Sequence, residues 1–111
     1  MREVYGLIRR MGATSKYKGY HYVAEAVIMS ADIHERPLQI TKDIYPILAK
    51  KFKSTPSNVE HDIRTLVNMC WMTHRDTLEE IAGYTMEYKP TNSEFVDVLA
   101  YYLEKKNTTE V

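Results

Sequence analysis

The feature that most constrains the fold is a pair of helical segments joined by a short turn, over about residues 41–72. The first helix is predicted from ITKDIYPILAKKF, the turn from KSTPSN and the second helix from VEHDIRTLVNMCW. Lysines precede the turn, and a proline stands at the start of the second helix. A helix-turn-helix needs this arrangement to place one helix end in a DNA groove. The pattern therefore predicts a DNA-binding transcriptional regulator.

The second helix of this pair has the clearest pattern in the chain. Thr55 can cap it, and Pro56 suits the first helical position because the N–H it lacks would have no partner there. Apolar residues recur at offsets of 0, 4, 7, 8, 11 and 12, which predicts a buried stripe anchored by Trp71. The stripe consists of Val59, Ile63, Leu66, Val67, Cys70 and Trp71. The opposite face carries Ser57, Asn58, His61, Arg64, Thr65 and Asn68, and it fits either a DNA-reading surface or a solvated one.

Periodicity predicts further helices and no strand, so we expect one all-α domain over residues 1–111, a six-helix bundle. Pro46 implies that the first turn of the helix capped by Thr41, which should run to about Phe52, is either separate or bent. The tail, residues 105–111, is expected to fray. The remaining helices are expected at Val4–Met11, from Tyr20 until before Pro37, at Arg75–Ala82 with Gly83 as its end, and after the capping box Thr91–Glu94.

Composition limits the setting of the protein. The single cysteine excludes an internal disulfide and fits a reducing compartment. No segment resembles a signal peptide, and none approaches the roughly 18 apolar residues of a transmembrane helix. We therefore expect a cytoplasmic protein with no membrane partner.

The neutral net charge conceals an asymmetry along the chain. Residues 1–64 hold eleven Lys/Arg against seven Asp/Glu, whereas residues 65–111 hold four against eight. A basic half that meets phosphate, beside an acidic half that does not, is one interpretation; chance scatter is the other.

Catalysis has no support in the sequence. The four histidines are far apart, and none has zinc-motif spacing with Cys70. Cys70 itself falls on the apolar stripe, which indicates a core residue rather than a nucleophile. We expect no enzymatic activity, no metal and no cofactor.

Several motifs occur in an order and spacing that we know from one family. They are KGYHYVAEAV at 18–27, ITK, YP and AKKF between 40 and 52, Trp71, GYT at 83–85 and KPTNSEF at 89–95. Together they resemble the C-terminal effector domain of the sporulation initiation factor, the stage-zero sporulation protein A of endospore-forming Firmicutes. The resemblance covers about residues 3–104.

The resemblance implies a six-helix bundle whose third and fourth helices form the helix-turn-helix. It implies binding to double-stranded DNA at a box resembling TGTCGAA, often as a head-to-tail homodimer on tandem boxes. It also implies contact with the sigma factor of RNA polymerase through the segment matching Thr73–Met86, which here carries Asp76, Glu79 and Glu80.

Two departures from the family pattern stand out. The chain begins at Met1 without the receiver domain, and either an excised or a free-standing effector fits. The family has arginines where this chain has Asn58 and His61, and alanine in place of Asp62. Arginine clamps guanine, asparagine suits adenine, and histidine gives a pH-sensitive contact, so we expect altered base specificity.

The candidate interface divides into base-contacting and phosphate-contacting residues. The predicted base contacts are Asn58, His61, Arg64 and Thr65, and the predicted phosphate contacts are Lys51, Lys53, Ser54, Thr55 and Ser57. Lys16 and Lys18 are expected to extend the basic surface. The alternative is a protein-interaction module that has lost useful DNA affinity and binds RNA polymerase or a full-length relative.

Overall fold

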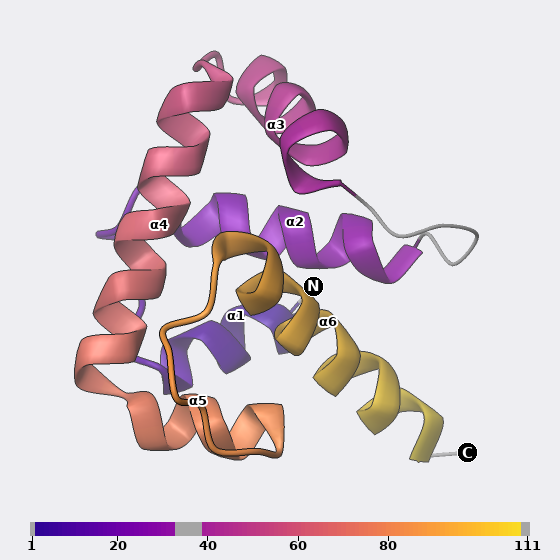
Figure 1. The fold of residues 1–111 in the computed structure, drawn as a ribbon. Coiled ribbons are helices and arrows are strands. Elements are labelled where there is room, and N and C mark those ends of the chain that lie inside the picture. Colours follow the sequence, from indigo (N-terminus) through magenta and orange to yellow (C-terminus); the bar gives the residue numbers. More distant parts are fainter. Residues whose placement is uncertain (1, 33–38, 110–111) are drawn as a thin grey trace.

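The computed structural model describes residues 2–32 and 39–109, which form six α-helices and one π-helical turn (Figure 1). This part of the chain contains no strand, so the predicted all-α class is confirmed. The predicted end of the second helix before Pro37 lies outside the described residues. The elements are α1 (Arg2–Arg10), α2 (Gly19–Asp32), η1 (Ile40–Ile44), α3 (Tyr45–Lys51), α4 (Pro56–Thr73), α5 (Arg75–Ala82) and α6 (Asn92–Thr109).

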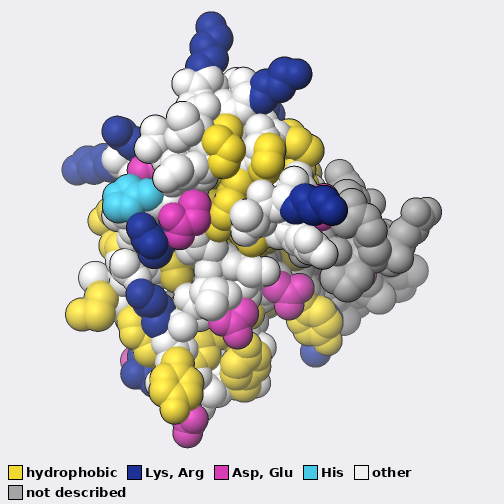
Figure 2. Space-filling view, turned by 45° about the horizontal axis from the view of Figure 1, so that its top comes forward, with side chains coloured by type: hydrophobic (Ala, Val, Ile, Leu, Met, Phe, Trp, Pro, Cys, Tyr) yellow, Lys and Arg dark blue, Asp and Glu magenta, His cyan; other side chains and the backbone are white. Residues whose placement is uncertain are grey.

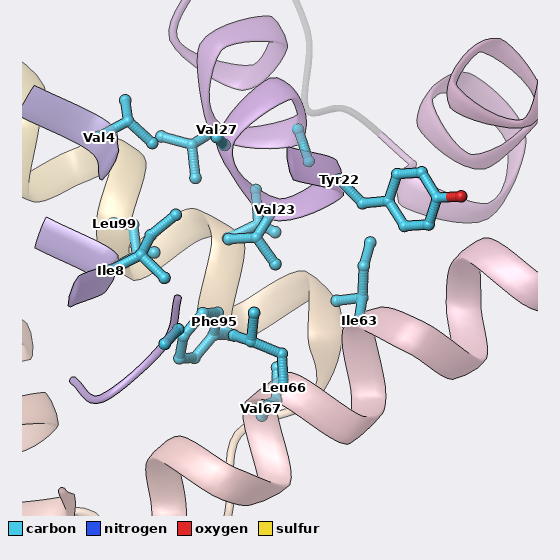
Figure 3. Close-up of a cluster of buried hydrophobic side chains, with 14 of the residues drawn as sticks. Val4, Ile8, Tyr22, Val23, Val27, Ile63, Leu66, Val67, Phe95 and Leu99 are labelled. Carbon is cyan, nitrogen blue, oxygen red and sulfur yellow. The ribbon is translucent and has the colours of Figure 1, made fainter. Parts of the chain in front are cut away.

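Helix α2 is the centre of the bundle and packs against α1, α3, α4 and α6. Helical spacing of apolar residues predicts a buried stripe from Tyr20 to Ala31, which is buried up to Val27 and half-buried at Ile28 and Ala31. Tyr22 and Ala26, which lie outside this stripe, are buried as well. A helix with neighbours on several sides buries more than one face. Figure 3 shows the consequence: Val23 and Val27 point into the core, whereas Tyr22 points away from it. The Tyr22 ring meets the edge of Phe52 at a centroid distance of 5.2 Å, next to α3.

The core forms where α1, α2, α4 and α6 meet (Figure 3). Ile8, Val23, Ile63 and Phe95, one from each of these helices, have no exposed surface. The predicted role of Trp71 as the anchor of the α4 stripe is wrong. Twelve residues after Val59, a helix has turned to a position about 120° from Val59, so Trp71 lies at the edge of the stripe and is only half-buried. The Arg75 guanidinium covers its ring at 4.2 Å.

The caps predicted at three helix ends are confirmed. Thr55 accepts a hydrogen bond from the Asn58 N–H at 3.1 Å, which caps α4. Thr91 and Glu94 each accept from the other's N–H, at 3.1 and 2.9 Å, which is the predicted capping box of α6. Gly83 ends α5 in the left-handed conformation with φ of 85°.

The predicted cap at Thr41 is wrong. The chain instead enters a π-helical turn, and the carboxylate of Asp43 accepts from the Gln39 N–H at 2.9 Å. The helix proper begins anew at Tyr45, so Pro46 falls in its first turn, where proline is tolerated. This confirms the separate first turn. At the other end of the chain, α6 is helical to Thr109, which differs from the predicted fraying from residue 105.

Helices α2 and α4 approach each other unusually closely at Gly19. A Cβ at this position would lie 2.4 Å from the carbonyl oxygen of Asp62, which is far inside contact distance. The atoms nearest to this added methyl group belong to the backbone of Asp62 and Ile63, so no flexible side chain can move aside. Glycine at position 19 therefore allows the start of α2 to lie directly against α4.

We predict that Gly19→Ala lowers the free energy of unfolding by about 1–3 kcal/mol, because α2 must move away from α4. Gly6→Ala is the matched control: Gly6 is also helical, but a Cβ there would meet nothing within 4 Å. That variant should gain about 0.5–1 kcal/mol. Urea denaturation measures both, and equal stability of the two variants would contradict the close approach.

Candidate nucleic-acid interface

Backbone hydrogen bonds hold the turn between α3 and α4. The Ser54 N–H donates to the Ala49 carbonyl at 2.8 Å, and the Lys53 N–H donates to Lys50 at 3.4 Å. This pair of bonds is a Schellman motif, which needs a left-handed residue at its centre. That residue is Lys53, with φ of 54°, the one non-glycine residue of positive φ in the described chain. The motif directs the Lys53 side chain outward from the turn, where it is exposed.

The N-terminal half of α4 presents the predicted DNA-contacting side chains to solvent. Five of the six members of this polar face are exposed, namely Ser57, Asn58, His61, Arg64 and Thr65, whereas Asn68 is half-buried. Lys51, Lys53 and Thr55 are exposed beside them, and Ser54 is half-buried. In Figure 2, where this end of the molecule is turned toward the viewer, a histidine lies near Lys and Arg side chains and directly beside an acidic side chain. The predicted site residues are thus brought together at one end of the bundle, which is compatible with a helix-turn-helix.

Arg64 is held by its own helix. One guanidinium nitrogen lies 3.3 Å from the Glu60 carboxylate, and the other donates to Nδ1 of His61 at 3.0 Å. His61 accepts this bond only while Nδ1 carries no proton, which leaves Nε2 as the donor. The Thr65 hydroxyl donates to the His61 carbonyl at 3.0 Å. Asn58 differs from these residues, because its side chain makes no hydrogen bond within the described chain and is free to bind a base edge.

Lys51 is held by a different helix. Its ammonium lies 2.6 Å from the carboxylate of Glu25 on α2, and it also lies 5.6 Å from the Phe52 ring. Glu25 is mostly buried, with 19% of its side chain exposed. The pair ties the end of α3 to α2 and neutralises one predicted phosphate contact. Lys50 and Lys53 form no ion pair within the described residues.

The acidic residues predicted to contact polymerase differ in their availability. Glu79 is mostly buried, contacts Arg75 at 3.5 Å and accepts from the Met86 N–H at 2.7 Å. It therefore holds the loop after α5 in place. Asp76 is exposed, and Glu80 is 75% exposed with Arg10 at 3.8 Å.

Cys70 and the histidines have structural surroundings. Burial raises the pKa of the Cys70 thiol to about 12, so it stays protonated and unreactive at neutral pH. Nδ1 of His21 bonds to the Tyr5 hydroxyl at 2.8 Å, and His74 packs against Gly12. His34 lies outside the described residues. Within residues 2–32 and 39–109, no cluster of His, Cys, Asp or Glu is arranged to hold a metal ion, and no helix has the length and apolarity to span a membrane.

Sequence reasoning missed a set of contacts between the start of α6 and α4. The Lys89 ammonium donates to the side-chain oxygen of Asn68. The Asn92 amide donates to the Tyr45 hydroxyl at 2.9 Å and to the Glu60 carbonyl at 3.1 Å. Burial raises the pKa of Tyr45, so its hydroxyl remains protonated. No local pattern predicts these contacts, because the partners are distant in sequence.

Comparison with known families agrees with this architecture. The family model described as "Sporulation initiation factor Spo0A C terminal" matches residues 4–103, nearly the whole chain. The chain therefore belongs to the family of the Spo0A C-terminal domain, a DNA-binding effector domain. The resemblance found in the sequence is confirmed.

We predict that Lys53→Gly raises the free energy of unfolding by about 1 kcal/mol, because glycine adopts a positive φ without steric penalty. Lys50→Gly is the control: it removes the same charge from the neighbouring helix and should lower stability by about 1 kcal/mol. Chemical denaturation distinguishes them. If Lys53→Gly proved as destabilising as Lys50→Gly, the left-handed conformation at Lys53 would be refuted.

Proposed function

We propose that this member of the Spo0A C-terminal family is a sequence-specific, double-stranded DNA-binding transcriptional regulator with altered base specificity. The observation that carries the proposal is the exposed polar face of α4, which begins directly after a lysine-bearing turn. A helix that enters the major groove by its N-terminal end reads bases with such side chains. The turn lies beside that end, so its cations are in position to meet the backbone.

The chemistry of the polar face suggests which bases are read. The free Asn58 amide suits the N6 and N7 atoms of adenine, with which it makes two hydrogen bonds. His61 offers its Nε2–H to an acceptor such as guanine O6 or thymine O4. Arg64 can clamp guanine only after it leaves Glu60, so its contribution is reduced by the energy of that ion pair. Guanine readout is therefore expected to be weaker than with arginines at positions 58 and 61.

Further parts of the proposal concern the surroundings of the DNA contact. Lys53, Ser54, Thr55 and Ser57 bind backbone phosphates, Lys51 adds a phosphate contact only when it leaves Glu25, and the protein binds tandem boxes as a homodimer. Asp76 and Glu80 form the contact with a polymerase sigma factor, since their carboxylates face solvent. Glu79 supports this contact indirectly, through the loop that it holds.

A second function is favoured by the internal ion pairs. Glu25 and Glu60 neutralise two of the cations that DNA binding would use, Lys51 and Arg64. A bundle with such neutralised cations suits a protein-interaction module that binds RNA polymerase or a full-length relative. The two functions differ in one respect: only the DNA regulator requires steeply salt-dependent binding to a duplex.

Selection from a random duplex library, followed by fluorescence anisotropy of the selected site, tests the proposal. We expect enrichment of a site with adenine at the position read by Asn58, bound more tightly than a scrambled duplex. The variant Asn58→Arg should instead prefer guanine at that one position, with a binding free energy about 1–3 kcal/mol more favourable than with adenine there. Recovery of the unchanged TGTCGAA-like box would refute the altered specificity, and no enrichment with salt-independent binding would favour the interaction module.

Removing the Glu25 carboxylate should strengthen binding to any duplex, because Lys51 is then free to meet a phosphate. We predict that Glu25→Gln steepens the dependence of log K on log salt by up to about 0.9, the value for one added phosphate contact. Glu80→Gln removes the same charge from α5, at the other end of the bundle from α3 (Figure 1), and should leave the slope unchanged. Salt titrations of both variants measure the effect, and equal slopes would exclude Lys51 as a released phosphate ligand.

A further inference from the structure

The polar face of α4 is flanked on both sides by other parts of the chain. On one side the start of α2 touches the α4 backbone at Asp62, because Gly19 lacks a side chain. This contact places the exposed Lys16 and Lys18, which directly precede α2, beside α4. On the other side, the start of α6 is bonded to α4 at Glu60 through Asn92. Figure 1 shows α4 between these two segments.

Lys89 belongs to the second flank and is held in a defined place. Its ammonium donates to Asn68, which lies one turn after Arg64 on α4. Pro90, the next residue, is buried, and Asn92 is bonded to both Tyr45 and α4. The loop end that carries Lys89 is therefore fixed to the helix whose polar face it borders. An ammonium group has three N–H donors, so two remain for an external acceptor.

The surroundings of Lys89 form an open cleft with more than one cation. The cleft has a volume of about 400 Å³, and its lining includes Lys89, Arg64, Thr41 and Ser93. Glu60 also lines it, but its carboxylate is paired with Arg64. Glu94 accepts from the Thr91 N–H, and Glu87 stands exposed two residues before Lys89. The lysine is thus the cation of the cleft whose charge no carboxylate contacts within 4.0 Å in the described chain.

The shape of DNA decides what fits such a lysine. The major groove is about 12 Å wide, so a helix inserted in it has a phosphate backbone along each of its two flanks. The lysines of the turn lie at the N-terminal end of α4, and Lys16 and Lys18 lie along one of its flanks. On the other flank of α4, Lys89 would face the second phosphate backbone of the DNA.

From this geometry we propose that Lys89 is a DNA-phosphate ligand that binds the backbone along the flank of α4 opposite Lys16 and Lys18. The inference rests on the proposed DNA-binding function. It adds a contact outside the helix-turn-helix, supplied by the loop before α6. Because phosphate is present in every sequence, this contact gives affinity and orientation rather than base preference.

The test is the salt dependence of duplex binding by Lys89→Ala, measured by fluorescence anisotropy on the site selected for the unaltered protein. Loss of one phosphate contact reduces the slope of log K against log salt by about 0.9 and weakens binding roughly five- to tenfold at 0.1 M salt. A scrambled duplex should show the same change in slope. Lys89→Arg keeps a cation and should retain the slope.

Lys105→Ala is the matched control, since Lys105 is an exposed lysine of α6 near the opposite end of that helix. It changes the net charge equally, but its slope should match that of the unaltered protein. Equal slopes for Lys89→Ala and Lys105→Ala, with DNA binding intact, would refute the role of Lys89 but not the DNA-binding function. Absence of salt-dependent binding by the unaltered protein would overturn the DNA-binding function as well.

A neutral backbone analogue locates the contact. Replacing single phosphates with methylphosphonates along one strand should weaken binding by the unaltered protein at the phosphate that Lys89 contacts. The same replacement should have no effect on Lys89→Ala. If each replacement weakened both proteins equally, no individual phosphate would depend on Lys89, and the proposal would be refuted.

Discussion

The structure depends on α4 serving two surfaces at once. One side of this helix supplies Ile63 and Leu66 to the core, and the other side presents the polar face. The helix is fixed at both edges, by the backbone contact with Gly19 and by the hydrogen bond from Asn92. With its edges fixed, the polar face cannot rotate relative to the turn that precedes it. Base reading requires this rigidity, because a hydrogen bond to a base edge tolerates little displacement.

Internal carboxylates moderate the charge of the interface. Glu25 holds Lys51 and Glu60 holds Arg64, so these cations are ordered before any ligand arrives. Under the proposed function, each exchanges a carboxylate for a phosphate or a base, and the net gain is the difference between two charged contacts. Lys53, Asn58 and Lys89 bear no such constraint from a carboxylate. The binding energy is therefore expected to come mainly from residues without an internal ion pair, with Arg64 adding specificity where guanine repays its release.

The sequence was informative where the structure is determined locally. Thr55, the Thr91–Glu94 box and Gly83 act within one helical turn, so their patterns predicted the caps correctly. The start of α3 differs from the prediction because Asp43, rather than Thr41, accepts the hydrogen bond from the backbone at this turn, from the Gln39 N–H. Periodicity and capping signals predict the helices, the motifs identify the family, and the resemblance implies the same six-helix bundle. In contrast, Lys51 meets Glu25 across 26 residues, and Asn92 meets Glu60 across 32. Such contacts depend on tertiary packing, and no periodicity encodes them.

The central claim is that the polar face of α4, with its two flanks, is the DNA-binding surface. The most direct measurement is the change in backbone amide NMR shifts when the protein is titrated with its selected duplex. We predict the largest changes in residues 53–65, with further changes at 14–18 and 89–93. Changes confined to α5 and the C-terminal half of α6, with the amides of α4 unaffected, would contradict the claim.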